Sequence, residues 1–392
     1  MPSVVVAGAG LGGLRVAESL RRSGFSGAVT VVGDEPWLPY SRPPLSKEAL
    51  AGGVDVAALE FRRKADVDDV EWLLGRPITH ADLENHCIVV GDDITIPFDG
   101  LAVATGLRPR VLPIPGPVTG RFRLRSAADA AALRERLRPG AQVVILGAGF
   151  IGCETSATAR SLGCEVHVVA LDAEPMVEAL GRDVGAAMRR RHEAHGVRFH
   201  LGHTVDRFDG DVTVDSAVLS DGTVLRADVV IEAVGSVPNV GWLVGSGLDL
   251  SDGVLVDSAM QVLADVPLVA VGDVARHPNA LFGPVPRRIE HWSMATETGR
   301  RAGRTLTALL GGTEPDRSPF TAMPSFWSDQ YDYALQSFGM PHLAERSEVL
   351  SGELDDACIV GYFDAVGLVG VVGIDRTAEL VPYRAELLGR AG

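Results

Sequence analysis

The sequence contains almost no lysine. Only Lys47 and Lys64 interrupt a set of 36 basic residues that otherwise consists of arginine. Acidic residues number 51, which gives the 392-residue chain a formal net charge of −15. Proteins that bind nucleic acid need a basic face for the phosphates, so this charge argues against a nucleic-acid partner.

Cysteine and long apolar runs are scarce as well. The four cysteines form no CxxC pair, which is typical of a reduced, cytoplasmic protein. No apolar run reaches about 18 residues, so no membrane span is expected. Residues 1–10, MPSVVVAGAG, lack the basic stretch of a signal peptide. Four histidines offer two HxxH spacings without nearby cysteines, so no metal site is expected at His192, His195, His200 and His203.

Glycine is abundant, and its placement is informative. Residues 4–13 read VVVAGAGLGG, an apolar run followed by glycines at positions 8, 10 and 13. In a dinucleotide-binding unit the first glycine, Gly8, permits a tight turn, and Gly10 lets a pyrophosphate approach the backbone. Gly13 lets the following helix pack closely on the strand, and the N-terminus of that helix faces the phosphates.

The residues after this turn complete the unit. A helical pattern follows, then a second strand at 28–32, then the acids Asp34 and Glu35. Either acid can accept hydrogen bonds from the adenosine ribose hydroxyls. The whole arrangement is repeated at 142–172, where QVVILGAGFIG precedes a helix and the strand EVHVVALD. The repeated glycines are Gly147, Gly149 and Gly152. Two complete units on one chain imply two bound dinucleotides.

With both units in place, the chain resembles the glutathione-reductase-type flavoproteins, and among them the ferredoxin reductases coupled to oxygenases or to cytochromes P450. The stretches that carry the resemblance run in the family's order from residue 4 to residue 333: VVVAGAGLGG, PYSRPPLSK, AVATG, GAGFIGCE, AVGSVPN, AVGDVA, EHW and FWSDQYD. RPPLSK and FWSDQ are specific to this branch. The resemblance implies FAD on the first unit, NAD(P)H on the second, and electron transfer to a [2Fe–2S] ferredoxin.

The resemblance also implies an α/β architecture with three domains. An FAD-binding domain, Rossmann-like, is expected at 1–110 and 237–313, and a second Rossmann-like domain for NAD(P)H is inserted at 111–236. Residues 314–392 form a C-terminal α+β domain that helps to cover the flavin. In this last domain the pattern predicts strands at 357–363 and 366–372 and a helix near 377–389. Three apolar strands end in a small residue and glycine, at the level where such sheets bind ligands, namely 100–106, 228–235 and 267–273.

The wider flavoprotein class places an active-site disulfide in the first helix after the flavin unit. Residues 36–60 contain no cysteine, and Cys153 and Cys164 belong to the second unit. A disulfide relay is therefore not expected. The resemblance then implies a flavin that passes electrons out directly, one at a time, to an iron–sulfur partner.

Lys47 has an expected partner in the second unit. In the stretch PYSRPPLSKEAL, Pro43 and Pro44 stiffen the backbone ahead of it. The resemblance implies that Lys47 pairs with Glu154, one turn into the second helix, near N5 of the flavin. A compact ammonium can reach the charge that develops on a reduced flavin, whereas a guanidinium makes a wide fork. The alternative interpretation is two unrelated surface charges.

The resemblance implies further contacts to each cofactor. Those to FAD are Gly8, Gly10, Leu11, Gly13, Asp34, Glu35, Arg42, Lys47, Thr105, Gly106, Arg125, Asp273, Trp292 and Trp327. Those to the nicotinamide nucleotide are Gly147, Gly149, Ile151, Gly152, Glu154, Asp172 and Gly235. Several have plain alternatives, because arginines often lie on the surface and tryptophans are often ordinary core residues.

The implied partner poses an electrostatic problem, since ferredoxins of this kind are acidic and so is this chain. Docking then needs a local basic patch. The candidates near the EHW stretch are Arg287, Arg288, Arg300, Arg301 and Arg304. A solvated arginine face is the alternative. Two other functions stay open: an NADH oxidase or quinone or dye reductase on the same scaffold, and a flavin-binding interaction protein resembling the apoptosis-inducing relatives.

Residue 170 bears on the choice of nucleotide. The family's NADH users carry a glutamate there, whereas this chain has Ala170, with Asp172 two residues on as a substitute. An arginine for a 2′-phosphate is distant, because the nearest, Arg182, lies ten residues past Asp172. We therefore expect weak nucleotide binding with NADH preferred, measured by titration of the purified protein. Tighter binding of NADPH would overturn this preference.

Overall fold

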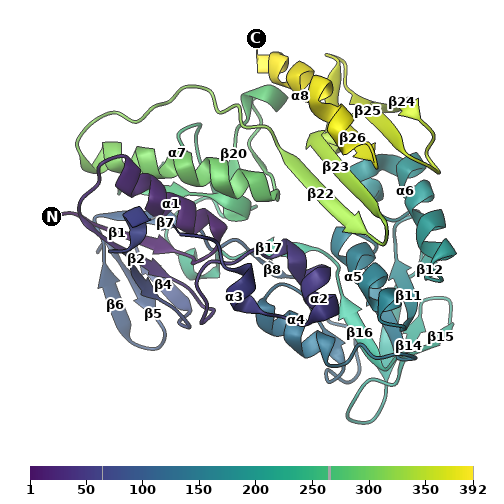
Figure 1. Ribbon diagram of the computed structural model, residues 1–392. Coiled ribbons are helices and arrows are strands. Elements are labelled where there is room, and N and C mark those ends of the chain that lie inside the picture. The colour runs from purple at the N-terminus through teal and green to yellow at the C-terminus, as the bar shows by residue number, and fades with distance from the viewer. Residues whose placement is uncertain (64, 264–265, 392) are drawn as a thin grey trace.

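The computed structural model describes residues 1–63, 65–263 and 266–391 (Figure 1). Its first large sheet is parallel, has the order β19-β7-β1-β2-β3 and draws strands from distant parts of the chain. The strands are β1 (Ser3–Ala7), β2 (Ala28–Val32), β3 (Glu71–Leu73), β7 (Gly100–Val103) and β19 (Leu268–Ala270). The interior of β1 is almost fully buried, as expected of a parallel strand that is covered on both faces.

Two helices lie side by side against this sheet. α1 (Leu11–Arg22) follows β1, and α7 (Trp292–Leu310) packs along it (Figure 1). A Cβ on Gly303 of α7 would lie 2.4 Å from the Cβ of Ser19 on α1, so only glycine permits this approach. The smaller elements of this part are β4 (Ile78–Asp82), β5 (Cys87–Val90), β6 (Ile94–Pro97), α2 (Glu48–Gly52), α3 (Val56–Leu59), β18 (Val254–Leu255), β20 (Ala275–His277) and β21 (Arg287–Arg288).

The second large sheet repeats the first design around the second glycine turn. It is parallel, with the order β12-β11-β10-β16-β9. Its strands are β9 (Arg121–Phe122), β10 (Gln142–Leu146), β11 (Glu165–Ala170), β12 (Arg198–Leu201) and β16 (Val229–Glu232). The helices are α4 (Ala127–Arg134), α5 (Phe150–Ser161) and α6 (Val177–Ala194), and a small antiparallel sheet contains β13 (Val205–Asp209), β14 (Ser216–Leu219) and β15 (Val224–Arg226).

The chain enters and leaves this second unit through one short strand pair. β8 (Leu107–Pro109) pairs antiparallel with β17 (Ser236–Pro238), so the outgoing and returning segments run side by side. The second unit is therefore inserted in the first, as the sequence predicts. The boundaries at residues 110, 236 and 313 stay a prediction, because sheet pairing does not define a boundary to the residue.

The third large sheet is antiparallel and belongs to the C-terminal segment. Its order is β22-β23-β26-β25-β24, and the predicted hairpin is confirmed as the β25–β26 pair. The strands are β22 (Ser325–Gln330), β23 (Tyr333–Gly339), β24 (Arg346–Gly352), β25 (Cys358–Phe363) and β26 (Leu368–Ile374). β22 reaches down to contact both α5 and α7, which brings the C-terminal sheet to the meeting point of the two Rossmann-like units (Figure 1).

The structure shortens several predicted elements. The strands expected at 100–106, 228–235 and 267–273 end within each segment, because glycines with positive φ turn the chain out of the sheet, namely Gly106 (61°), Gly235 (88°) and Gly272 (66°). The predicted final helix starts as a 3₁₀ turn, and α8 (Val381–Leu388) begins next to Pro382, which suits a first helical turn. Within the residues described, no helix combines the length and the apolar character that crossing a bilayer requires.

Candidate functional site

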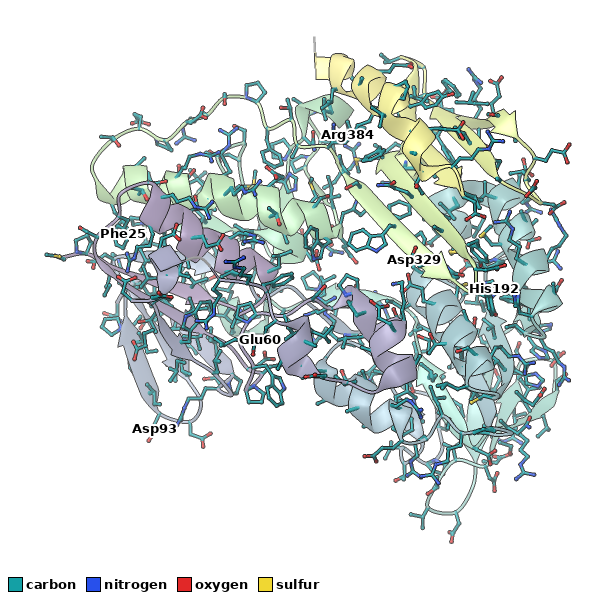
Figure 2. All side chains as sticks on the ribbon, in the orientation of Figure 1. Phe25, Glu60, Asp93, His192, Asp329 and Arg384 are labelled. Carbon is teal, nitrogen blue, oxygen red and sulfur yellow. The ribbon has the colours of Figure 1, made fainter. Side chains whose placement is uncertain are left out.

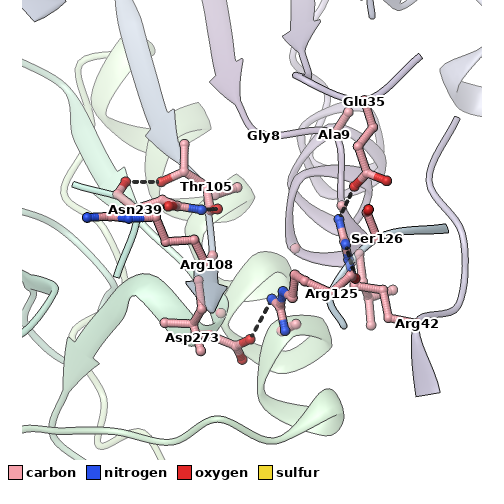
Figure 3. Close-up of a pocket in the computed structure, with 18 of the residues that line it drawn as sticks. Gly8, Ala9, Glu35, Arg42, Thr105, Arg108, Arg125, Ser126, Asn239 and Asp273 are labelled. Carbon is pink, nitrogen blue, oxygen red and sulfur yellow. Dashed lines mark hydrogen bonds and ion pairs between the residues drawn. The ribbon is translucent and has the colours of Figure 1, made fainter. Parts of the chain in front are cut away.

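A cavity of about 880 Å³ opens at the carboxyl ends of the first sheet. Residues from the first glycine turn, the 34–47 arm, the inserted unit and β22 all line it. Figure 3 shows how the polar side chains Glu35, Arg42, Arg125 and Asp273 gather around this space. All three parts of the chain thus contribute to one pocket, in agreement with the position expected of ligands in doubly wound sheets.

Gly8 and Gly13 of the first turn have the geometric roles that the sequence predicts, and the role of Gly10 toward a pyrophosphate stays a prediction. Gly8 has a φ of +122°, and a Cβ there would lie 2.2 Å from the carbonyl oxygen of Ala104. A Cβ on Gly13 would lie 2.0 Å from the oxygen of Gly8, so this glycine permits close packing of α1. Gly10 has no atom within 4 Å of its Cβ position and lines the cavity. The open space is where a pyrophosphate can approach the backbone.

The second turn repeats this geometry. A Cβ on Gly147 would lie 2.3 Å from the oxygen of Ala233, and one on Gly152 would lie 2.1 Å from the oxygen of Gly147. Gly149, like its counterpart in the first turn, faces open space. Each turn therefore leaves one unobstructed backbone position at a helix N-terminus, and both fit a dinucleotide phosphate.

The 34–47 arm, which follows β2, is held in place by Glu35. Glu35 accepts hydrogen bonds from Tyr40 Oη at 2.5 Å and from Arg42 Nη2 at 2.5 Å. Arg42 Nη1 also donates to the backbone oxygen of Arg125 at 2.7 Å. Burial, reinforced by the neighbouring carboxylate, raises the pKa of Tyr40 to about 12. Arg42 is thus held in the cavity wall, while Asp34 lines the cavity with its side chain exposed.

A second polar group lines the cavity beside this arm (Figure 3). Arg125 Nη2 lies 3.4 Å from Asp273 Oδ2, and burial together with repulsion from Arg42 lowers the pKa of Arg125. Thr105 Oγ1 donates to the backbone oxygen of Asn239 at 2.7 Å, and Asn239 Nδ2 donates back to Thr105 O at 3.0 Å. The sequence points to Thr105, Arg125 and Asp273 but not to Asn239, although Asn239 ends the stretch AVGSVPN that carries part of the resemblance.

The two tryptophans named from the sequence meet at the mouth of the cavity. Trp292 and Trp327 pack edge to face, with ring centroids 5.9 Å apart and planes at 78°. They are 39% and 41% exposed, so neither is an ordinary core residue. Phe326, the neighbour of Trp327, points to the other side of β22 and packs on Phe150 at 4.9 Å. Contact of either tryptophan with a flavin stays a prediction.

Lys47 and Glu154 form a buried ion pair. Lys47 Nζ lies 2.8 Å from Glu154 Oε2, and the two side chains are 12% and 5% exposed. The contact predicted for this pair is therefore present, and the alternative of two unrelated surface charges is excluded. Lys47 Nζ also donates to the backbone oxygen of Pro43 at 3.2 Å, which ties the ammonium to the stiff start of its own helix. Both residues line the cavity.

Glu154 receives two further donors that the sequence does not reveal. Ser46 Oγ donates to Oε2 at 2.5 Å, and Ser328 Oγ donates to Oε1 at 2.7 Å. The donors come from the arm of the first unit and from β22, while Glu154 itself lies on α5 of the inserted unit. One signal was available: Ser328 belongs to the branch-specific stretch FWSDQ. Glu154 therefore has three donors around it, and such donors offset the cost of burying a carboxylate.

Of the residues named for the nicotinamide nucleotide, Ile151 lies at the cavity, whereas Asp172 and Gly235 lie elsewhere. Ile151 is 43% exposed and lines the cavity, next to the second glycine turn. Asp172 is exposed just past β11, and Gly235 follows β16; neither is among the residues that line the cavity. Both sit near the carboxyl edge of the second sheet, the level of its own glycine turn. Their contact with a nucleotide stays a prediction.

The proposed basic patch is less uniform than the sequence indicates. For Arg301 the prediction is wrong, because its side chain is only 10% exposed and lies 2.8 Å from Asp316 Oδ2. Arg288 is 14% exposed and bridges two acids, and Arg300 pairs with Glu297 one helical turn away at 2.7 Å. Arg304 is exposed. The number of arginines in the sequence therefore overstates the positive charge exposed on this surface.

The fold and the site together define the class. Two glycine turns that fit dinucleotide phosphates, with an ion pair buried at the cavity, are typical of an oxidoreductase. The model of the pyridine nucleotide-disulphide oxidoreductase family matches residues 2–299, and that of the reductase C-terminal domain matches residues 325–391. The chain belongs to the pyridine nucleotide-disulphide oxidoreductase family.

Relatives match along nearly the whole chain. Rhodocoxin reductase of Rhodococcus erythropolis is 34% identical over 393 residues, covering 97% of this chain and 88% of the relative. The anthranilate 1,2-dioxygenase system ferredoxin–NAD(+) reductase component of Burkholderia cepacia is 36% identical over 391 residues, covering 98% and 91%. A solved structure, the covalent putidaredoxin reductase–putidaredoxin complex, contains a chain with a TM-score of 0.91 and 30% identity, covering 99% of this chain and 93% of that one.

The contrasting glycine environments give a prediction about flavin binding. Gly10→Ala adds a carbon where no protein atom lies within 4 Å, so the chain should fold normally. That carbon would occupy the space of the approaching pyrophosphate, and we expect FAD binding to weaken by about 1–3 kcal/mol. The ratio of flavin to protein absorbance and the melting temperature of the apoprotein measure the two effects.

The matched control is Gly13→Ala, whose added carbon would lie 2.0 Å from the oxygen of Gly8. This variant should lose stability as well as flavin. If Gly10→Ala retains FAD with unchanged affinity, the first glycine turn is not the pyrophosphate site.

Proposed function

We propose that this protein oxidises NADH and passes the electrons singly, through bound FAD, to a [2Fe–2S] ferredoxin that serves an oxygenase or a cytochrome P450. The names of the relatives support it, since one is a ferredoxin–NAD(+) reductase component and another stands in complex with putidaredoxin. The observation that carries it is the buried Lys47–Glu154 pair at the cavity. The wider class has a disulfide in the first helix after the flavin unit, whereas residues 36–60, which include Lys47, contain no cysteine.

The cysteines support a direct route from the flavin. Cys153, Cys164 and Cys358 are buried free thiols, and Cys87 is half-buried and unpaired. Burial raises the pKa of Cys153, next to Glu154 on α5, so this thiol stays protonated and inert. Without a dithiol at the cavity, the electrons must leave through the flavin itself.

Bound FAD supplies an acceptor for a hydride and a donor of single electrons. The chain contributes the surroundings. Lys47 places a point charge in the cavity wall, where it can attract developing negative charge, and Glu154 fixes the direction of the ammonium. Ser46 and Ser328 keep Glu154 from turning away. Trp292 and Trp327 shield the mouth of the cavity from water.

The preference for NADH has support in the second unit. Ala170, at the end of β11, is 6% exposed and offers no polar atom beyond its backbone. Asp172, two residues later, is exposed and free to turn toward ribose hydroxyls, and a carboxylate there disfavours a 2′-phosphate. The printed name of the Burkholderia cepacia relative, which specifies NAD(+), agrees with this choice.

We infer that the ferredoxin docks near the tryptophan pair, because electrons must cross a short gap from the flavin. The basic residues left for this surface are Arg287, Arg288, Arg300 and Arg304, since Arg301 is buried. Several are partly neutralised by acids, so we expect weak, salt-sensitive docking on a patch of modest charge.

Anaerobic stopped-flow measurements test the function. The purified yellow protein should be reduced rapidly by NADH and slowly by NADPH, and added [2Fe–2S] ferredoxin should then reoxidise the flavin. Rapid reduction without electron transfer to any ferredoxin would favour the oxidase or quinone reductase. Failure of both nucleotides to reduce the flavin would favour the interaction protein.

Replacement of Lys47 by arginine conserves the positive charge but changes the cationic group from a compact ammonium to a planar guanidinium. Lys47→Arg should slow flavin reduction by NADH about tenfold to hundredfold, because a fork cannot occupy the position of an ammonium 2.8 Å from Glu154 Oε2. Stopped-flow flavin absorbance measures the rate, and flavin content controls for loss of binding. An unchanged rate would remove Lys47 from the reaction.

A further inference from the structure

A buried chain of hydrogen bonds extends from Glu154 away from the cavity. Ser328 Oγ donates to Glu154 Oε1 at 2.7 Å, and Gln330 Nε2 donates to Ser328 Oγ at 2.9 Å. Gln330 Oε1 lies 2.7 Å from His192 Nε2. The four residues are between 0% and 4% exposed, so little water competes for these contacts. This series of hydrogen bonds ends at His192 on α6, which Figure 2 labels.

The sequence explains how β22 carries the middle of this chain. Side chains alternate along a strand, so Ser328 and Gln330 share one face and Asp329 takes the other. Ser328 and Gln330 are buried, whereas Trp327 and Asp329 are exposed. The buried face packs on α5, which places the Ser328 hydroxyl beside Glu154 and the Gln330 amide beside Ser328. The C-terminal sheet thereby contacts the ion pair through the polar side chain of Ser328, and it also lines the cavity with Trp327.

The surroundings of Gln330 determine which way its amide points. Its oxygen accepts from Tyr333 Oη at 2.9 Å, and burial raises the pKa of this tyrosine, so the hydroxyl keeps its proton. Its nitrogen faces Met176 Sδ at 3.9 Å, a thioether that can accept but cannot donate. The nitrogen must therefore also face Ser328. Because Ser328 accepts from this nitrogen, its single proton goes to Glu154.

His192 reinforces the same orientation. Since Gln330 Oε1 can only accept, His192 Nε2 must carry the proton between them. The other nitrogen, Nδ1, lies 3.2 Å from Tyr331 Oη and 3.2 Å from Ser156 Oγ, and Ser156 already donates to Cys153 O at 2.7 Å. Tyr331 is left as the donor to Nδ1. Burial lowers the pKa of His192 to about 4, so the neutral ring is the form present near pH 7.

We propose that His192 and Gln330 are positioning residues that act through Ser328 to hold the Glu154 carboxylate in place for Lys47. Without the His192 N–H, Gln330 Oε1 keeps only the donation from Tyr333 Oη, so reversal of the Gln330 amide becomes easier. Its oxygen would then compete with Glu154 for the proton of Ser328, and the carboxylate would lose one of its three donors. The consequence for electron transfer rests on the proposed function, but the coupling itself does not.

The scarcity of lysine makes the coupling measurable. In holoenzyme labelled with ¹⁵N at the lysine side chains, only Lys47 and Lys64 can give ammonium signals. Lys47→Arg assigns them by removing one. In His192→Ala the Lys47 ammonium protons should exchange with water about tenfold faster, the order expected when a hydrogen bond to a charged group is lost. His192→Gln, which retains a side-chain N–H donor, should restore much of the protection.

The control and the decisive comparison use the same signal. Tyr331→Phe removes only the contact at His192 Nδ1 and should leave exchange within about twofold of the wild type. Ser328→Ala should speed exchange, and adding His192→Ala to it should have no further effect, because the link between them is already broken. Additive effects, or an unchanged signal in His192→Ala, would overturn the proposal. If His192→Ala fails to fold, Gln330→Met replaces it in the same cycle.

This experiment uses neither nucleotide nor ferredoxin. A protein that fails to reduce any ferredoxin but shows the non-additive lysine exchange would refute the proposed function and retain the coupling. A protein that reduces ferredoxin with unaltered lysine exchange in every variant would do the reverse.

Discussion

The rest of the site depends on keeping one charged carboxylate out of water. Glu154 is 4% exposed, and a carboxylate in that position is tolerated only when donors surround it. Lys47, Ser46 and Ser328 supply those donors from two other parts of the chain. The three donors to Glu154 are thus complete only when the 34–47 arm, the inserted unit and the C-terminal sheet are assembled together. The atoms that join the three parts of the chain are therefore the same atoms that form the ion pair at the cavity.

This dependence gives the C-terminal sheet a larger role than a cover. Its outward residues, Trp327 and Asp329, face solvent and the cavity mouth, while the inward residues Ser328 and Gln330 reach the ion pair. One strand therefore carries two functions on its two faces, which a period of two makes possible. The face with Trp327 limits access to the cavity, and the face with Ser328 and Gln330 orients the Lys47–Glu154 ion pair.

Sequence reasoning worked where a backbone constraint leaves a mark on residue type. The glycine turns were readable because Gly8, Gly13 and their counterparts have no room for a side chain. The Lys47–Glu154 contact came from the family resemblance, since nothing local links two residues so distant in sequence. His192 and Gln330 were missed because their meeting depends on tertiary packing. The prediction for Arg301 was wrong because an arginine is usually exposed, whereas this one is buried and pairs with the exposed Asp316.

The insertion has a consequence for how the chain is made. The first sheet is complete only when β19 joins β7, and α7 must then pack on α1. Both late elements are synthesised after the entire inserted unit, whose own strands are contiguous between β9 and β16. During translation the second unit can therefore fold before β19 is made, while β7 of the first sheet still lacks its neighbouring strand. The first glycine turn, although encoded at the very start, therefore belongs to a unit that is among the last parts of the molecule to be completed.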